Sequence, residues 1–254
     1  MIMKLGSPVF YGLMALIAVC TLALWYGLRQ KAMAQRRKRM LIICAFNIVF
    51  FFIYRYSQSI DEEFLRLTDK EFFNWFGELP LQLCYINMLL IPIGLLIKKR
   101  SVMAVAFFAG SLGAFMAILF PDAVYSGFSI LLPRMLLYYL LHVSIVVCSV
   151  SLCTLGFYRP SFKDLLPTLI ITTLLALLMH GVNTLLRVTG ICTTANYFFT
   201  YGTTSSLLSL FWDLIPIPYV YELPLALIFA AYITVVTAPF ALLDRKLRKN
   251  PCSA

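Results

Sequence analysis

Residues 131–155 read LLPRMLLYYLLHVSIVVCSVSLCTL, and the only side chain among them with a full charge at neutral pH is Arg134. A helix needs about 20 predominantly apolar residues to cross the roughly 30 Å hydrocarbon core of a bilayer. Stretches of the same kind recur along the chain, at about 8–28, 40–57, 79–97, 102–120, 165–187 and 220–243. The pattern predicts a single all-α transmembrane domain over residues 1–254, a polytopic bundle of about seven helices.

The composition of the whole chain agrees with this prediction. Apolar residues make up 61% and charged residues 13%, whereas a soluble domain carries about 25% charged residues. This balance argues against a water-soluble enzyme, a nucleic-acid-binding protein and a secreted disulfide scaffold. The seven cysteines form no CxxC pair and no cluster with zinc-ligand spacing. We therefore expect no metal, no cofactor and no nucleic-acid partner.

The charged residues are divided between alternate loops. Fifteen of the 21 lysines and arginines lie in loops 29–39, 98–100 and 154–164 and in the C-terminal tail. Nine of the eleven acids lie on the opposite side: Asp61, Glu62, Glu63, Asp69, Glu71, Glu78, Asp122, Asp213 and Glu222. Because cytoplasmic loops carry the excess of Lys and Arg, we predict a multi-pass protein of the cell membrane with its N-terminus outside and its C-terminus inside.

Two of the predicted outer segments are longer than simple turns. Residues 58–78 are acidic and aromatic with helical spacing, which predicts an acidic surface helix. Residues 188–219 are semi-apolar and almost uncharged, and a loop of that length without structure is uncommon. We expect this second segment to be re-entrant or to lie along the membrane interface.

Polar side chains within the predicted spans share helix faces, because residues three or four apart are neighbours on a helix. Ionisable groups in a span are costly and mark functional sites by default. The residues with this spacing are Arg134, Tyr138 and His142 on one span, His180, Asn183 and Arg187 on the next, and Cys84 and Asn87, with Gln82 nearby, on a third. Counted at about 1.5 Å per residue, they lie in the outer half of the bundle. The spacing predicts one shared polar chamber.

Each of these residues also has a purely structural interpretation. A cysteine in an apolar helix can be a small hydrophobic residue, and an intramembrane histidine can be a hydrogen-bonded strut between helices. Near the outer ends of their spans, Arg55, Arg134 and Arg187 are predicted to extend to lipid phosphates. Together, however, a cysteine and a histidine provide the minimal machinery for a covalent acyl intermediate. Asn or Tyr donors could hold the resulting oxyanion.

Several short motifs, in order, resemble a known family. They are Leu79-Pro80-Leu81-Gln82-Leu83-Cys84, then His142 58 positions after the cysteine, Ala195-Asn196-Tyr197-Phe198-Phe199, and the Ser-Leu-Leu…Pro-x-Pro-Tyr stretch over 205–219. This set resembles the YwaF-type integral membrane proteins, bacterial relatives of the animal transmembrane acyltransferase that loads polyunsaturated chains onto ether phospholipids. The resemblance covers about 40–243 and implies a Cys84 nucleophile, a His142 partner, and Asn196 and Tyr197 as residues that shape the site. Gln82 stands where that family pattern has histidine.

We therefore predict a membrane-embedded acyltransferase acting on phospholipid or lysophospholipid, with an acyl-thioester on Cys84 and acid–base catalysis by His142. The expected substrate-binding residues are Asn87, Arg134, Tyr138, His180, Asn183, Arg187, Asn196 and Tyr197. Among them, Asn87, Asn196 or Tyr197 would hold the oxyanion and Arg134 or Arg187 a lipid phosphate. Three alternatives stay open: a small-solute transporter or its membrane subunit, a lipid esterase, and a non-catalytic assembly partner. Head group, acyl chain and oligomeric state are not specified by the sequence.

Overall fold

The structure, a computed structural model, describes residues 2–68, 72–121, 125, 127–202 and 206–249. Three of the acids used in the charge argument, Asp69, Glu71 and Asp122, lie outside these residues. Within them the chain is helical, and the isolated bridge between Ile2 and Ser129 is the one β pairing. The all-α prediction is therefore confirmed for the described part of the chain.

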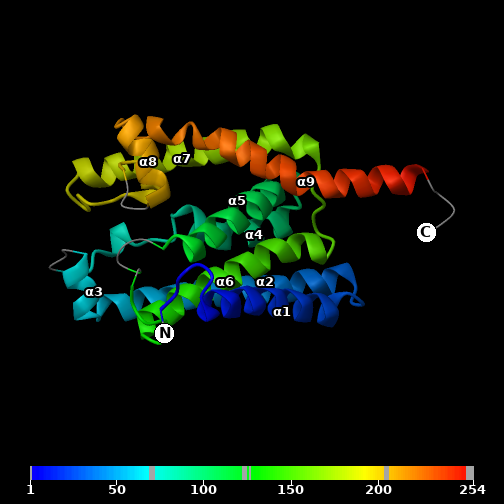
Figure 1. The fold of residues 1–254 in the computed structure, drawn as a ribbon, viewed down its shortest axis with the longest axis horizontal. Coiled ribbons are helices and arrows are strands. Elements are labelled where there is room, and N and C mark those ends of the chain that lie inside the picture. The colour runs from blue at the N-terminus through cyan, green and yellow to red at the C-terminus, as the bar shows by residue number, and fades with distance from the viewer. Residues whose placement is uncertain (1, 69–71, 122–124, 126, 203–205, 250–254) are drawn as a thin grey trace.

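In the described part of the chain, the bundle is formed by seven longer helices (Figure 1): α1 Pro8–Leu28, α2 Met33–Ser59, α4 Leu83–Ile97, α5 Arg100–Leu119, α6 Pro133–Thr154, α7 Leu165–Val188 and α9 Leu225–Lys249. Among the described residues, six helices are long and apolar enough to cross a membrane, and α4 is a shorter apolar helix of 15 residues. The predicted count of about seven is close. The chain is a multi-pass membrane protein by the length and apolar composition of its helices.

Five of the seven longer helices begin at residues other than those the sequence pattern predicted: α2, α4, α5, α6 and α9. α4 begins at Leu83, whereas the predicted span began at 79, because the preceding residues form turns and Gln82 bonds elsewhere. α2 begins at Met33, whereas the predicted span began at 40. The basic segment joins α2 because Arg36 bonds the carbonyls of Lys31 and Leu155, at 2.8 and 3.0 Å.

The two long outer segments contain short helices. Within 58–78, the last residues of α2 are followed by α3 Glu62–Leu67 and by one 3-10 turn, η1 Trp75–Gly77. Residues 188–219 contain the 3-10 turn η4 Tyr197–Phe199 and the helix α8 Ser206–Leu214. Two further 3-10 turns, η3 Phe162–Asp164 and η5 Val220–Glu222, precede α7 and α9.

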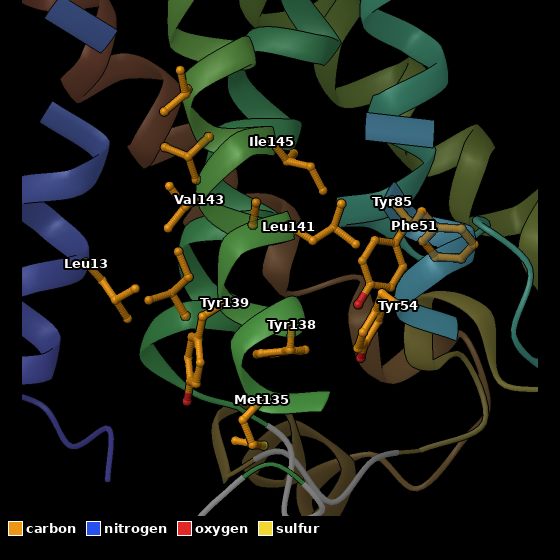
Figure 2. Close-up of a cluster of buried hydrophobic side chains, with 14 of the residues drawn as sticks. Leu13, Phe51, Tyr54, Tyr85, Met135, Tyr138, Tyr139, Leu141, Val143 and Ile145 are labelled. Carbon is orange, nitrogen blue, oxygen red and sulfur yellow. The ribbon is translucent and has the colours of Figure 1, made fainter. Parts of the chain in front are cut away.

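The bundle has a central layer of α4, α5 and α6. In Figure 1, α1 and α2 lie along α6 on one side, and α7 and α9 lie on the other side of the layer. A close approach of α4 and α5 depends on Gly110, because a Cβ there would lie 1.7 Å from Nδ2 of Asn87. Figure 2 shows the core around α6, with Leu13 of α1 on one side and Phe51, Tyr54 and Tyr85 on the other.

The seven longer helices alternate in direction (Figure 1), so the connecting loops gather at two ends. We call the end with loops 29–32, 98–99 and 155–164 the basic end, and the end with α3, η1 and α8 the acidic end. Two acids at the basic end are paired: Asp164 with Arg100 at 2.7 Å, and Asp244 with Arg159. The tertiary structure thus separates the charges as the sequence pattern did.

Candidate functional site

A cavity of about 1080 Å³ lies between the central layer and the α7–α9 side, toward the acidic end. This volume is slightly above the range of roughly 300–1,000 Å³ that is typical of small-molecule sites. Residues of α2, α4, α5, α6, α7, α8 and α9 and of the segments before α4 and α9 line it. The cavity is therefore built from most of the bundle and from residues distant in sequence.

The cavity wall has an apolar part and a polar part. One stripe of α5, continued by its C-cap residue Phe120, runs along it with the three- and four-residue spacing of a helix face: Ala109, Leu112, Gly113, Met116, Ala117 and Phe120. At 1.5 Å per residue this stripe is about 16 Å long. The polar side chains on the wall include Arg55, Glu78, Gln82, Cys84, His142, Asn196 and Glu222. A ligand that fits would have a long apolar part and a polar group.

Cys84 is the second residue of α4, is half-buried and lines the cavity. The first backbone hydrogen bond of α4 runs from Ile86 N–H to Gln82 C=O. The N–H groups of Leu83, Cys84 and Tyr85 therefore lie ahead of the helical hydrogen-bond ladder. Amides at a helix N-terminus carry partial positive charge, which favours an oxyanion beside Cys84.

His142 lies on α6 with 1% of its surface exposed, and it lines the same cavity. Its Nδ1 is 2.8 Å from the carbonyl oxygen of Tyr138. A carbonyl oxygen only accepts, so Nδ1 carries a proton and Nε2 holds the lone pair of the neutral ring. The arrangement leaves Nε2 as the nitrogen that can act as a base.

Cys84 and His142 share the cavity but are not hydrogen-bonded to each other among the described contacts. Two tyrosine rings surround the imidazole, Tyr138 at 4.3 Å and Tyr85 at 5.2 Å between centroids. Tyr85 directly follows Cys84 in the chain. Catalytic hydrogen bonds are often long before substrate binds. The structure therefore places Cys84 and His142 in one cavity without forming a hydrogen bond between them.

Arg55 does not extend to the membrane surface, which corrects the expectation for this residue. It is 5% exposed and pairs with Glu78 at 2.7 Å. Its Nη1 also donates to Gln58 Oε1 at 2.8 Å. The rings of Phe51, Tyr54 and Tyr85 lie 5.1–5.2 Å from its guanidinium carbon. The charge is thus held inside the bundle by a carboxylate, an amide and three rings.

Sequence reasoning missed the pair of Arg55 and Glu78, although a signal was present. Arg55 lies near the outer end of the predicted span 40–57, and Glu78 directly precedes the predicted span 79–97. Opposite charges at the same predicted depth on two helices can pair. The spacing rule for single helices does not compare different helices, so it did not connect these residues.

A group of hydroxyl and amide groups adjoins the Arg55 pair. Tyr54 donates to the Tyr125 hydroxyl at 2.8 Å, and Gln58 Nε2 lies 2.7 Å from the same hydroxyl. Tyr125 stacks on Tyr138 with ring centroids 4.3 Å apart. Desolvation raises the pKa of Tyr125 above its ordinary value, against the opposing effect of Arg55. The Tyr125 phenol therefore stays neutral and can donate.

The α6 stripe, Arg134, Tyr138 and His142, is divided by the fold. Tyr138 lines the cavity with His142, and its hydroxyl donates to Ala117 C=O at 2.8 Å. Arg134 is 2% exposed and does not line the cavity. Arg134 pairs with Asp61 and Glu63, both at 2.7 Å, and so ties α6 to α3. It is therefore another arginine that does not extend to lipid phosphate.

The pairing with Arg134 affects the acidity of Asp61. Desolvation opposes the charged carboxylate, but hydrogen bonds from Arg134 and from the Phe64 amide outweigh it and lower the pKa of Asp61. Asp61 also caps α3 through the bond from Phe64 N–H at 2.9 Å. Asp61 is thus ionised near neutral pH and joins two elements at the acidic end.

The α7 stripe, His180, Asn183 and Arg187, holds the following loop and does not line the cavity. Asn183 is fully buried and makes three hydrogen bonds, to Tyr197 C=O, from Tyr197 N–H and to the Thr200 hydroxyl. Arg187 Nε donates to Ala195 C=O at 2.7 Å. His180 and Arg187 both pack on the ring of Tyr201, at 4.9 and 4.3 Å. Arg187 is therefore engaged by the loop.

Gln82 connects two motifs that lie more than a hundred residues apart, the one at 79–84 and the one at 195–199. Its Nε2 donates to Asn196 C=O at 3.1 Å, and its Oε1 accepts from Phe198 N–H at 2.8 Å. The Tyr197 hydroxyl accepts from Leu79 N–H at 3.0 Å and donates to Phe76 C=O. Gln82 thus positions the loop at Asn196 and Phe198 beside Cys84. This role needs an amide donor and acceptor and no titratable group.

The loop that Gln82 holds is conformationally strained. Phe198 and Phe199 have φ of 58° and 62°, in the left-handed region that bulky residues rarely adopt. Such backbone persists where surrounding contacts over-determine it, and it is concentrated at functional sites. Asn196 supplies one such contact, with its Nδ2 donating to Gly202 C=O at 2.6 Å. Asn196 lines the cavity, whereas Tyr197 does not.

Asn87 is placed away from the cavity. It is 1% exposed, and its Nδ2 donates to the Ser149 hydroxyl on α6 at 2.8 Å. Its Oδ1 is buried without a hydrogen-bond partner among the described residues. In this position Asn87 joins α4 to α6. The sequence interpretation expected Asn87 to donate to the oxyanion. The backbone amides at the start of α4, beside Cys84, are better placed to do so.

The site therefore combines a cysteine at a helix N-terminus, a neutral histidine and a buried arginine on the wall of one long cavity. A sequence profile of the TMEM164 family matches residues 6–243. No curated protein and no solved structure matches the chain. Since the match extends over nearly the whole sequence, the chain belongs to the TMEM164 family.

Proposed function

We propose that this TMEM164-family protein is a membrane-embedded lipid acyltransferase that moves an acyl chain between phospholipids through a thioester on Cys84. The observation that carries the proposal is that Cys84 and His142 line one cavity with a long apolar wall. An acyl chain would lie along the α5 stripe, and its ester carbonyl would reach the polar part of the wall. We further propose that the protein is one of the YwaF-like bacterial relatives and acts in the cell membrane.

In the first half of the reaction, His142 Nε2 takes the proton from the Cys84 thiol. The thiolate attacks the ester carbonyl of a phospholipid, and a bond forms between sulfur and carbonyl carbon. The bond from that carbon to the glycerol oxygen then breaks. The leaving oxygen receives the proton from His142, and a lysophospholipid departs, leaving the acyl group on Cys84.

In the second half, the hydroxyl of another lysophospholipid attacks the thioester carbonyl while His142 Nε2 takes its proton. The new carbon–oxygen bond forms as the carbon–sulfur bond breaks, and the proton returns to the Cys84 sulfur. No electrons are gained or lost, so no cofactor is required by this chemistry. Water in place of the lysophospholipid would make the same site an esterase.

The N-terminus of α4 provides the donors for the tetrahedral intermediate. The N–H groups of Leu83, Cys84 and Tyr85 precede the first helical hydrogen bond. Donors fixed in place before the reaction stabilise developing negative charge without a cost of reorganisation. The half-buried position of Cys84 favours this effect because a low-dielectric surrounding strengthens it.

The test is intact-protein mass spectrometry of the purified protein after incubation with mixed phospholipids, with and without neutral hydroxylamine. We expect a mass increment of one fatty acyl group that hydroxylamine removes and that Cys84→Ala abolishes. Cys20→Ala is the matched control, because Cys20 is also half-buried but does not line the cavity. It should keep the adduct.

Two other results would contradict the acyl-enzyme. Adducts that persist in Cys84→Ala would indicate nonspecific acylation of other cysteines. Absence of any adduct, with Cys84→Ala behaving as wild type in a transport assay, would favour the transporter. An adduct that forms but passes only to water would identify the esterase.

A further inference from the structure

Arg55 lies on the cavity wall but has no part in the proposed acyl-transfer steps. It is 5% exposed and has its Nε buried with no hydrogen-bond partner among the residues that the structure describes. Its guanidinium carbon lies 5.1 Å from the ring of Tyr85, the residue after Cys84. A cation held this close to the reacting cysteine, with a donor unused, is placed to receive an anionic group of the ligand.

The other arginines at the acidic end are not placed in this way. Among the described residues, Arg55 is the one Lys or Arg side chain on the cavity wall. Arg134 is buried against Asp61 and Glu63, and Arg187 bonds the loop. Arg55 is therefore the cation that a ligand within the cavity would meet.

We propose that Arg55 binds the phosphodiester of the lipid substrate, with Glu78 occupying the guanidinium until the lipid enters. Arginine matches phosphate oxygens with two parallel N–H donors. The three aromatic rings around Arg55 fix the plane of its guanidinium, so a phosphate can exchange with the Glu78 carboxylate without movement of the arginine. The inference rests on the proposed function for the lipid nature of the ligand.

The Glu78 carboxylate favours a phosphodiester over free phosphate. It lines the cavity and pairs with Arg55 at 2.7 Å. A phosphodiester has one negative charge, whereas a phosphate monoester has about −1.5 to −2 near neutral pH. Repulsion from the Glu78 carboxylate grows with the charge of the ligand. A membrane phospholipid therefore fits this wall better than inorganic phosphate does.

The experiment measures binding in a Cys84→Ser background, so that it does not depend on turnover. Native mass spectrometry of detergent-solubilised protein compares dioleoylphosphatidylcholine with dioleoylglycerol, which has the same acyl chains and no phosphate. Inorganic phosphate is added as a competitor in a separate arm. We expect the phospholipid to bind about tenfold or more tightly than the diacylglycerol, as for one charge-assisted hydrogen bond.

Three variants besides Arg55→Gln separate phosphate binding from folding. Arg55→Gln alone leaves a buried carboxylate unpaired and can fail to fold. The double variant Arg55→Gln, Glu78→Gln leaves no unpaired charge at this pair, and it should lower the phospholipid preference about tenfold. Glu78→Gln alone removes the competitor and should raise phospholipid affinity. Arg134→Gln is the matched control, a second buried arginine off the cavity wall, and should leave the preference within about twofold of its original value.

Several outcomes would overturn the inference. They are an equal affinity for both lipids in the parent protein, a full preference in the double variant, or an equal loss in Arg134→Gln. Displacement of the phospholipid by inorganic phosphate would overturn the assignment of a phosphodiester. Failure of the proposed function gives a different result, the absence of a Cys84 thioester in the wild-type protein, and this binding experiment still tests Arg55 in that case.

Discussion

The polar stripes on α6 and α7 have the same helical spacing in the sequence but contact different parts of the fold. Arg134, Tyr138 and His142 on α6 follow one face at steps of four residues, and the three residues on α7 follow at steps of three and four. On α6, Tyr138 and His142 face the cavity. On α7, every member bonds or packs on the loop that follows the helix. The comparison teaches that helical spacing identifies a face but not what the face contacts.

The largest expected effect separates the two histidines. His142→Gln should lower the rate of Cys84 thioester formation by about 10²–10⁴, the usual contribution of a general base. His180→Gln should leave that rate at the wild-type level, because His180 does not line the cavity and packs behind Tyr201, which does. The measurement is the initial rate of the hydroxylamine-sensitive adduct in each folded variant. Equal losses of rate in His142→Gln and His180→Gln would contradict the inference that only the α6 stripe acts in the reaction.

The next effect concerns stability on α7. Asn183→Ala should lower the free energy of unfolding by about 2–4 kcal/mol, because it leaves buried donors and acceptors of Tyr197 and Thr200 without partners. Thermal unfolding in detergent measures the loss. Asn183→Asp keeps the shape and the bond from Tyr197 N–H but buries a charge and puts an oxygen against Tyr197 C=O, so it should not recover the loss. An unchanged free energy of unfolding in Asn183→Ala would mean that the loop is held by other contacts.

A smaller effect is expected for the middle residue of the α6 stripe. Tyr138→Phe removes the hydrogen bond to Ala117 C=O but keeps the ring against Tyr125 and His142. We expect a loss of about 1 kcal/mol in the free energy of unfolding. The rate of thioester formation should not change, because the hydroxyl is engaged by the backbone. A large loss of rate in a stable variant would show that this hydroxyl acts in the reaction.

The smallest effect is the pH dependence of the contact between α6 and α3. The pKa of Asp61 is lowered in the folded protein from its ordinary value of 3.8. The stabilisation is therefore fully present above pH 3.8 and is lost as the pH falls through the lower, folded pKa. Asp61→Asn should weaken the dependence of Tm on pH in this acid range. An unchanged dependence would show that Arg134 draws its stability from Glu63, its other partner.

Part of the candidate site was accessible from the sequence. The motif residues identified Cys84, His142 and Asn196, and all three line the cavity. Arg55 and Glu78 were accessible only through their depth on separate helices, and the sequence interpretation placed Arg55 at lipid phosphate. The structure instead buries Arg55 against Glu78 at 2.7 Å. A snorkelling arginine and a paired one have the same sequence signal, because the partner lies on another helix.

By itself, the sequence determined the all-helical membrane bundle, the separation of basic and acidic ends, and which polar residues share a helix face. These properties follow from local periodicity and composition. Only the tertiary structure decided that Gln82 joins Asn196 and Phe198 across more than a hundred residues, and that Asn87 turns from the cavity toward Ser149. Such contacts depend on how helices dock, and packing selects one docking among several that the same amphipathic faces allow.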